Sequence, residues 1–138
     1  MTSRQEYIEK LRKSGLRPTN QRINICKLLF NRVDTFHFTI NDLAKMIESN
    51  AKEKISLATV YNTIHAFEKK GYLKEIVINS SQNYFDTNTS NHHHFFDENK
   101  KELIDLKEED VEPIRIKKTI PGKKIKSVEV LVKIDTDK

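Results

Sequence analysis

Residues 56–73, which read SLATVYNTIHAFEKKGYL, decide how this chain folds. The apolar residues Val60, Ile64 and Phe67 recur at the spacing that places side chains on one face of a helix. Ser56 is a preferred N-cap residue, and Gly71 follows two lysines as glycine commonly does at a helix end. The stretch therefore predicts an amphipathic helix that begins after Ser56 and ends at Gly71.

The sequence directly after this helix predicts a β-hairpin. Residues 72–78 (YLKEIVI) and 83–87 (NYFDT) are β-prone, and the polar turn formers NSSQ lie between them. Three further helices are expected earlier, in residues 3–16, 19–32 and 39–49, each of which starts with Ser or Thr. In the second of these, Cys26 falls on the apolar stripe and is expected in the core. Helices followed by a hairpin predict a winged helix-turn-helix domain over residues 1–86.

Residues 86–91 (DTNTSN) are turn formers and are expected to form a hinge. Beyond it, residues 93–96, 102–106 and 123–135 are predicted strands, and residues 108–115 at most a short helix interrupted by Pro113. The expected fold class is α+β, with the winged helix-turn-helix domain followed by a small α/β domain over residues 87–138.

Composition narrows the classes of function. The chain has 138 residues and a net charge of +5, and the whole basic excess lies in residues 1–85, which suits a phosphate-facing module. No apolar run is long enough to span a membrane and the N-terminus has no apolar signal core, so the expected compartment is the cytoplasm. A single cysteine, Cys26, can form neither an internal disulfide nor a four-thiolate zinc site.

The helix of residues 57–70 is the candidate DNA-reading element, because the second helix of such a domain offers its exposed N-terminal side chains to the major groove. The candidate contacts there are Ser56, Ala58, Thr59, Tyr61 and Asn62. Arg17, beside Pro18, is a candidate for a narrow A·T-rich minor groove. The alternative is that these residues form only the solvated face of a helix.

Three consecutive histidines suggest a metal site. On an extended strand His92 and His94 share a face and can chelate one ion, while His93 points the other way. His37, at the start of the third predicted helix, and Asp86, at the end of the hairpin, could complete a nitrogen and oxygen site for Fe²⁺, Mn²⁺ or Zn²⁺. The alternative is a cluster of polar residues in a surface loop.

His93 has a separate set of possible roles. It could serve a second metal site with Glu112, act as a haem ligand, or stay unligated.

The chain resembles the ferric uptake regulator (Fur) family over nearly its whole length. The motifs that carry the resemblance are SGLRPTNQR (14–22), LATVYNTIHAFEKKGYL (57–73), YFDTNTSNHHHFF (84–96) and KELIDL (101–106). The resemblance implies a homodimeric regulator that binds A·T-rich inverted-repeat DNA, with residues 87–138 as the dimerisation and ligand-sensing domain. It also implies that Tyr61 reads the major groove, that Arg17 enters the minor groove, and that His37, Asp86, His92 and His94 hold the regulatory ion.

Departures from the family pattern point to one of its branches. Asp97 and Lys100 stand where many members have the cysteine pair of a structural zinc site, and Asn91 and His93 replace a His and an Asp of a second site. These features and the ending at residues 120–134 look most like the iron response regulator (Irr) branch, whose members sense haem status. The resemblance thus implies a regulator of iron homeostasis that responds to a metal ion or haem.

Two other functions are compatible with the same residues. The metal could be purely structural in a DNA-binding protein, so that its loss unfolds the chain. A metal-dependent hydrolase using His92 and His94 is the alternative from another class. It would leave the basic helix and hairpin unexplained, and we therefore expect no enzyme activity.

Overall fold

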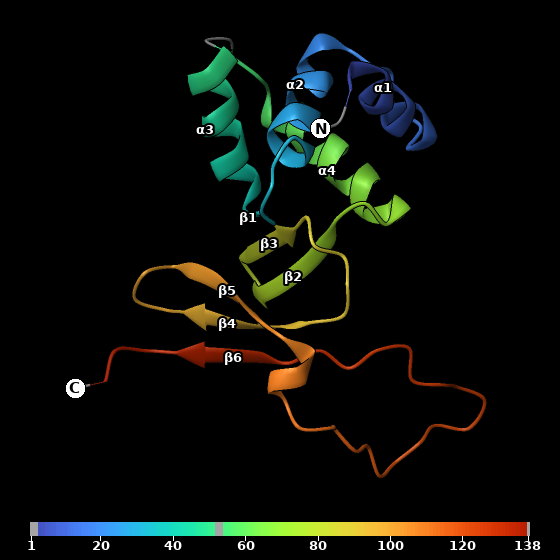
Figure 1. The fold of residues 1–138 in the computed structure, drawn as a ribbon, viewed down its shortest axis with the longest axis vertical. Helices are drawn as coiled ribbons and strands as arrows, with labels where there is room; N and C mark the ends of the chain where they lie inside the picture. Colours follow the sequence, from blue (N-terminus) through green and yellow to red (C-terminus); the bar gives the residue numbers. More distant parts are fainter. Residues whose placement is uncertain (1–2, 52–53, 138) are drawn as a thin grey trace. The chain divides into compact units, whose positions relative to one another are not determined.

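The computed structural model describes residues 3–51 and 54–137, and the chain divides into two compact units, Met1–Thr89 and Ser90–Lys138 (Figure 1). Within these described residues, the first unit contains four α-helices and a three-stranded sheet, and the second contains another three-stranded sheet. The expected α+β fold is confirmed. Among the described residues, no helix is long and apolar enough to cross a bilayer.

The four helices begin where the sequence predicts. They are α1 (Arg4–Lys13), α2 (Asn20–Phe30), α3 (Ile40–Ala51) and α4 (Leu57–Lys70). Each follows a hydroxyl side chain that accepts a hydrogen bond from the backbone N–H three residues later, which satisfies an otherwise unpaired donor of the first turn. These caps are Ser3 (3.3 Å), Thr19 (3.3 Å), Thr39 (3.1 Å) and Ser56 (3.1 Å). At the other end of α4, Gly71 has φ +91°, a conformation that glycine adopts without strain.

The apolar faces of these helices form the core of the first unit. Val60, Ile64 and Phe67 of α4 are fully buried, as their spacing predicts. Phe67 packs edge-on against Phe30 of α2, with ring centroids 5.7 Å apart. Cys26 is fully buried too, in agreement with its expected place in the core.

A small antiparallel sheet completes the first unit in the order β1-β3-β2, formed by β1 (His37–Phe38), β2 (Lys74–Asn79) and β3 (Gln82–Asp86). The β2–β3 pair is the expected hairpin, and its turn is held by the Asn79 side chain, which accepts from the Ser81 N–H at 2.9 Å. Strand β1 was not expected: His37 lies in it and not at the start of the third helix, which begins at Ile40. Two residues are too few to show the alternation by which strands are recognised.

The second unit is a sheet in the order β5-β4-β6. Its strands are β4 (His93–Asp97), β5 (Glu102–Leu106) and β6 (Leu131–Ile134). β4 pairs antiparallel with β5 and parallel with β6, and one 3₁₀ turn, η1 (Glu108–Asp110), follows β5.

The expected last strand, residues 123–135, is mostly wrong, because only residues 131–134 are paired. Their partner β4 has only five residues, so the earlier part of the alternating valine segment finds no ladder within this unit. Residues 111–130 contain no helix or strand, and Figure 1 shows them as a long loop from the end of η1 to β6.

Candidate metal centre

The first unit places His37 and Asp86 side by side. The two residues are directly opposite each other in the antiparallel β1–β3 pair, and His37 Nε2 lies 2.9 Å from Asp86 Oδ2. The other carboxylate oxygen, Oδ1, accepts from the backbone N–H of Asn88 at 2.8 Å, so the fully buried carboxylate is fixed in orientation. Strand β1, which no sequence pattern predicts, therefore brings together His37 and Asp86, which are 49 positions apart.

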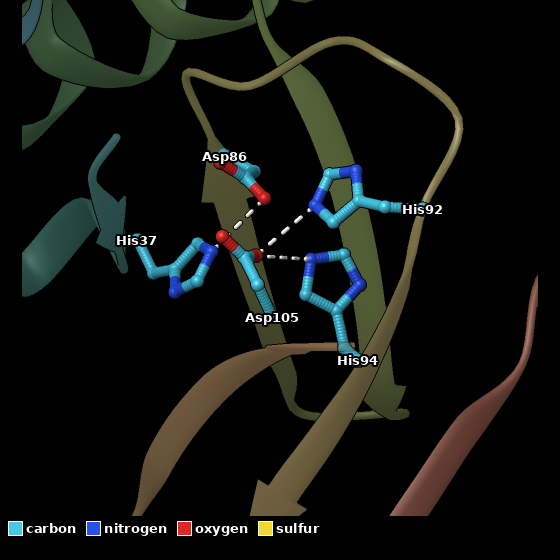
Figure 2. A group of neighbouring side chains, drawn as sticks. All are labelled: His37, Asp86, His92, His94 and Asp105. Atoms are coloured by element: carbon cyan, nitrogen blue, oxygen red, sulfur yellow. Dashed lines mark hydrogen bonds and ion pairs between the residues drawn. The ribbon is translucent and has the colours of Figure 1, made fainter. Parts of the chain in front are cut away.

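The second unit gathers three more donors at the start of its β4–β5 hairpin. His94 lies opposite Asp105, and its Nε2 is 3.4 Å from Asp105 Oδ1. His92 directly precedes β4 and places its Nε2 3.1 Å from the same oxygen. Figure 2 shows both imidazole rings turned toward the Asp105 carboxylate. His92 and His94 are buried, and the side chain of Asp105 is 35% exposed.

The hydrogen bonds of His92 determine which ring nitrogen carries the proton. Nδ1 lies 2.8 Å from the carbonyl oxygen of Ser90, which can only accept, so Nδ1 carries a proton. In a neutral ring Nε2 then keeps its lone pair and faces a carboxylate oxygen, which is also an acceptor. Two acceptors at 3.1 Å repel unless a proton or a metal ion lies between them. Fixing Nδ1–H on a carbonyl is the usual way in which a protein orients a metal-ligating histidine.

The distances fit shared coordination as well as hydrogen bonding. Donor atoms bound about 2.1 Å from one ion lie about 3.0 Å apart at right angles and about 3.4 Å apart at the tetrahedral angle. The three nitrogen–oxygen distances within the units, 2.9, 3.1 and 3.4 Å, lie in or next to this range. Histidine nitrogens with carboxylate oxygens suit Fe²⁺, Mn²⁺ or Zn²⁺.

Asp105 was missed by the sequence reasoning, although a signal for it existed. Residues 93–96 and 102–106 were both expected as strands, and pairing them as a hairpin puts Asp105 beside the histidines. The connecting turn explains why the register was not obvious. It contains Lys101 at φ +55°, and Asp97 accepts from the N–H groups of Asn99 and Lys100, both at 3.0 Å.

His93 points away from the other two histidines, as strand alternation predicts. Its Nδ1 accepts a hydrogen bond from the Val130 N–H at 2.9 Å, which leaves the ring proton of the neutral form on Nε2. This tautomer has no free lone pair for an ion or for haem iron. His93 and Glu112 both line a cavity of about 710 Å³ in the second unit, but no metal-ligating cluster of the described residues includes either.

Some of the candidate DNA contacts are exposed side chains, and others already form hydrogen bonds within the protein. Ala58, Tyr61 and Asn62 are exposed on α4, and Arg17 is exposed in the loop before α2. The hydroxyl of Ser56 caps α4 and lies 2.9 Å from that of Thr59, so these two side chains already have partners. The Tyr61 ring packs on His65 with centroids 4.1 Å apart, and His65 in turn meets Phe85 edge-on. His65 thus supports Tyr61 from beneath.

Cys26 is not suited to metal binding or redox chemistry. Burial raises the pKa of its thiol to about 12, against a smaller opposing effect of the nearby Lys10 ammonium. The thiolate is the reactive and metal-binding form of cysteine. With the pKa raised in this way, the thiol keeps its proton at neutral pH.

This chain is similar to known proteins in both sequence and structure. The sequence profile described as the ferric uptake regulator family matches residues 13–134. The Peroxide operon regulator of Bacillus subtilis is 35% identical over 101 residues, which cover 73% of this chain and 68% of that protein. The Peroxide-responsive repressor PerR of Staphylococcus epidermidis is 36% identical over 87 residues, and the match spans 63% of this chain but only 56% of that protein.

Solved structures support the fold. A ferric uptake regulator from Pseudomonas aeruginosa, determined with manganese, matches with a TM-score of 0.65 at 22% identity and covers 96% of this chain and 98% of that one. The ferric uptake regulator Fur of Helicobacter pylori, described as having three functional metal binding sites, matches with a TM-score of 0.67 at 16% identity. The match covers 98% of this chain and 92% of that one. At such identities the likeness shows the fold alone.

Proposed function

Because this chain belongs to the ferric uptake regulator family, we propose that it is a metal-responsive transcription repressor that binds operator DNA as a homodimer. The observation that carries the metal part is the Nε2 lone pair of His92 facing the acceptor Asp105 Oδ1 at 3.1 Å. The arrangement is favourable for a neutral ring only with a cation between the two atoms. Membership of a family of regulators speaks against the hydrolase alternative.

The proposed regulatory ion is bound by His37, Asp86, His92, His94 and Asp105 together. Only the five residues 87–91 separate Asp86 from His92 along the chain, so the two sets of donors are tethered closely. An ion that needs ligands from both units favours the arrangements that bring them together. Metal affinity and DNA affinity are then linked, with a coupling of about 1–3 kcal/mol.

Peroxide is the proposed signal, since both relatives named above are peroxide regulators. The buried Cys26 thiol is not available as the sensor, because peroxide attacks thiolates. A redox-active ion such as Fe²⁺ at the nitrogen and oxygen site would therefore be the reacting centre, and Mn²⁺ would fill the site without the same redox chemistry.

Haem, the signal of the iron response regulator branch, has weaker support. The neutral tautomer of His93 offers no lone pair, and the cavity beside it is lined by the acidic residues Glu108, Glu109, Glu112 and Glu129. Carboxylates repel the propionate groups of haem. We therefore prefer the peroxide response to the haem response.

DNA reading is assigned to α4 and to the loop before α2. Tyr61 and Ala58 are exposed and suited to thymine methyl groups, Asn62 to a base edge or phosphate, and Arg17 to an A·T-rich minor groove. The proposed operator is an A·T-rich inverted repeat, whose symmetry matches that of a dimer.

The test is an anaerobic DNA titration at fixed salt, because phosphate contacts make affinity depend on salt. We expect metal-free protein to bind an A·T-rich inverted repeat weakly, and Mn²⁺ or Fe²⁺ to strengthen binding by about 5–150-fold. Peroxide should then release DNA from the Fe²⁺ form and not from the Mn²⁺ form. If haem alone changed the affinity, the haem response would replace this proposal.

The same samples distinguish a regulatory metal ion from a purely structural one. If chelation unfolds the protein, as circular dichroism would detect, the ion supports the fold and does not act as a switch. No change in DNA affinity with any ion in folded protein would refute the regulatory role.

A further inference from the structure

The loop between η1 and β6 carries an unusual set of exposed side chains. From residue 114 to residue 126 it contains six basic residues and no acidic one: Arg115, Lys117, Lys118, Lys123, Lys124 and Lys126. All are exposed, and none forms an ion pair or a side-chain hydrogen bond with the residues that the structure describes. We call residues 114–126 the basic arm.

The basic arm also exposes apolar side chains. Ile114, Ile116, Ile120 and Ile125 are 41%, 48%, 65% and 55% exposed. Its tip is a tight turn in which Lys123 N–H donates to the Ile120 carbonyl at 3.0 Å and Gly122 has φ +78°. Four exposed isoleucines within 13 residues are typical of a surface that another protein covers.

A cavity of opposite charge lies at the base of the arm. It has a volume of about 710 Å³ and is lined, among other residues, by Glu108, Glu109, Glu112 and Glu129, while no Lys or Arg lines it. We call it the acidic cavity. Glu108, Glu109 and Glu112 are exposed, and their ion pairing among the described residues is limited to a long contact of 4.0 Å between Lys107 Nζ and Glu109 Oε1.

Both features belong to the second unit, yet the cations of the arm do not pair with the carboxylates of the cavity in the same chain. We propose that the basic arm of one copy docks in the acidic cavity of a second copy, and that the partner's arm docks reciprocally in the first. This inference rests on the proposed homodimer and names the surfaces that form it. A two-fold axis makes each contact occur twice, so a moderate attraction per contact is doubled.

A second copy explains more of the surface than DNA does. Phosphates would neutralise the arm's lysines but would leave the isoleucines in water and the acidic cavity empty. A second copy supplies carboxylates for the lysines and apolar surface for the isoleucines. Such an interface should weaken with salt, because its charges lie at a solvent-accessible surface.

Because the two contacts are reciprocal, the inference can be tested with the 138-residue chain. The arm variant is Lys123→Glu with Lys124→Glu and Lys126→Glu; the cavity variant is Glu108→Lys with Glu109→Lys and Glu112→Lys. Each homodimer would oppose like charges in both contacts, and we expect its dissociation constant to rise at least about 100-fold. An equimolar mixture should restore the dimer, because each variant then meets the opposite charge at both contacts.

Sedimentation velocity of each variant, of the mixture and of the wild type measures the effect. The control reverses three exposed lysines outside the arm, Lys45→Glu, Lys54→Glu and Lys100→Glu, and should remain dimeric. Recovery in the mixture also proves that both variants are folded.

Other outcomes overturn the inference. Variants that stay dimeric, monomers that the mixture does not restore, or a monomeric wild type would each refute it. Loss of DNA affinity in a still dimeric arm variant would assign the arm to DNA. If the variants stay dimeric, or if the mixture does not restore the dimer, the wild type can still show metal-dependent DNA binding. That combination would refute the docking of the arm but would leave the proposed function standing.

Discussion

The two units differ in the size of their buried apolar cores. The first buries a continuous apolar cluster contributed by all four helices and by Phe38 and Phe85 of its sheet. In the second, the buried apolar residues among those described are Phe96 and Leu103, next to three buried histidines. Small domains with little apolar core usually need a metal or a partner chain. We therefore expect a metal ion or a partner chain to stabilise the second unit more than the first.

The largest expected effect breaks the first unit. Phe67→Ala removes a fully buried ring from α4, and we expect a loss of about 3–5 kcal/mol in the free energy of unfolding from lost burial and the remaining cavity. Urea unfolding followed by circular dichroism measures it. Leu57→Ala, on the same helix but 53% exposed, is the control and should cost far less. Equal losses would mean that α4 does not anchor this core.

Metal should act mainly on the second unit. An ion present at 100 times its dissociation constant stabilises the folded state by about 2.7 kcal/mol. Hydrogen exchange should therefore slow in β4 and β5 when Mn²⁺ is added, much more than in α4.

His94→Gln should remove this protection, whereas the matched control His93→Gln should keep it, because His93 faces away from Asp105 and its Nδ1 is occupied by Val130 N–H. Equal loss in both variants would contradict the assignment of the ligands.

The exposed face of α4 offers a test of function that leaves the core intact. Tyr61 is 53% exposed, so Tyr61→Ala should hardly change stability but should weaken binding to the specific operator by about 1–3 kcal/mol. Fluorescence anisotropy with specific and random DNA measures the change. An equal loss on both DNAs would exclude base reading by Tyr61. His65→Ala should give a smaller loss of the same kind, because the His65 ring supports that of Tyr61.

The effect confined to the narrowest range of conditions, above pH 9, is a pH dependence that belongs to the core of the first unit. Burial raises the pKa of Cys26 from 9.0 to about 12, so between these values the folded state holds a proton that the unfolded state has lost. Stability is therefore complete below pH 9 and falls above it, by at most about 1.4 kcal/mol per pH unit from this group. Cys26→Ala should unfold with a flatter pH profile from pH 9 to 11, while Lys10 and Tyr84 still titrate in both proteins. Identical profiles would show that the thiol is not desolvated.

Local chemistry specifies several elements that can therefore be predicted from the amino-acid sequence. Hydroxyl caps, glycine ends and apolar spacing act within a few residues, which is why the four helices, the β2–β3 hairpin and the buried places of Val60, Ile64 and Phe67 could be predicted. The shared face of His92 and His94 followed from strand alternation in the same way.

Contacts between residues far apart in the chain depend on the three-dimensional fold. His37 reaches Asp86 through a two-residue strand, and Asp105 reaches the histidines through the register of a hairpin. The tautomers of His92 and His93 depend on Ser90 and Val130, and Val130 lies 37 residues from the ring that it contacts. The last strand ended early because its pairing partner is short. Ladder partners and hydrogen-bond acceptors are supplied by other segments of the chain, so no local pattern could reveal them.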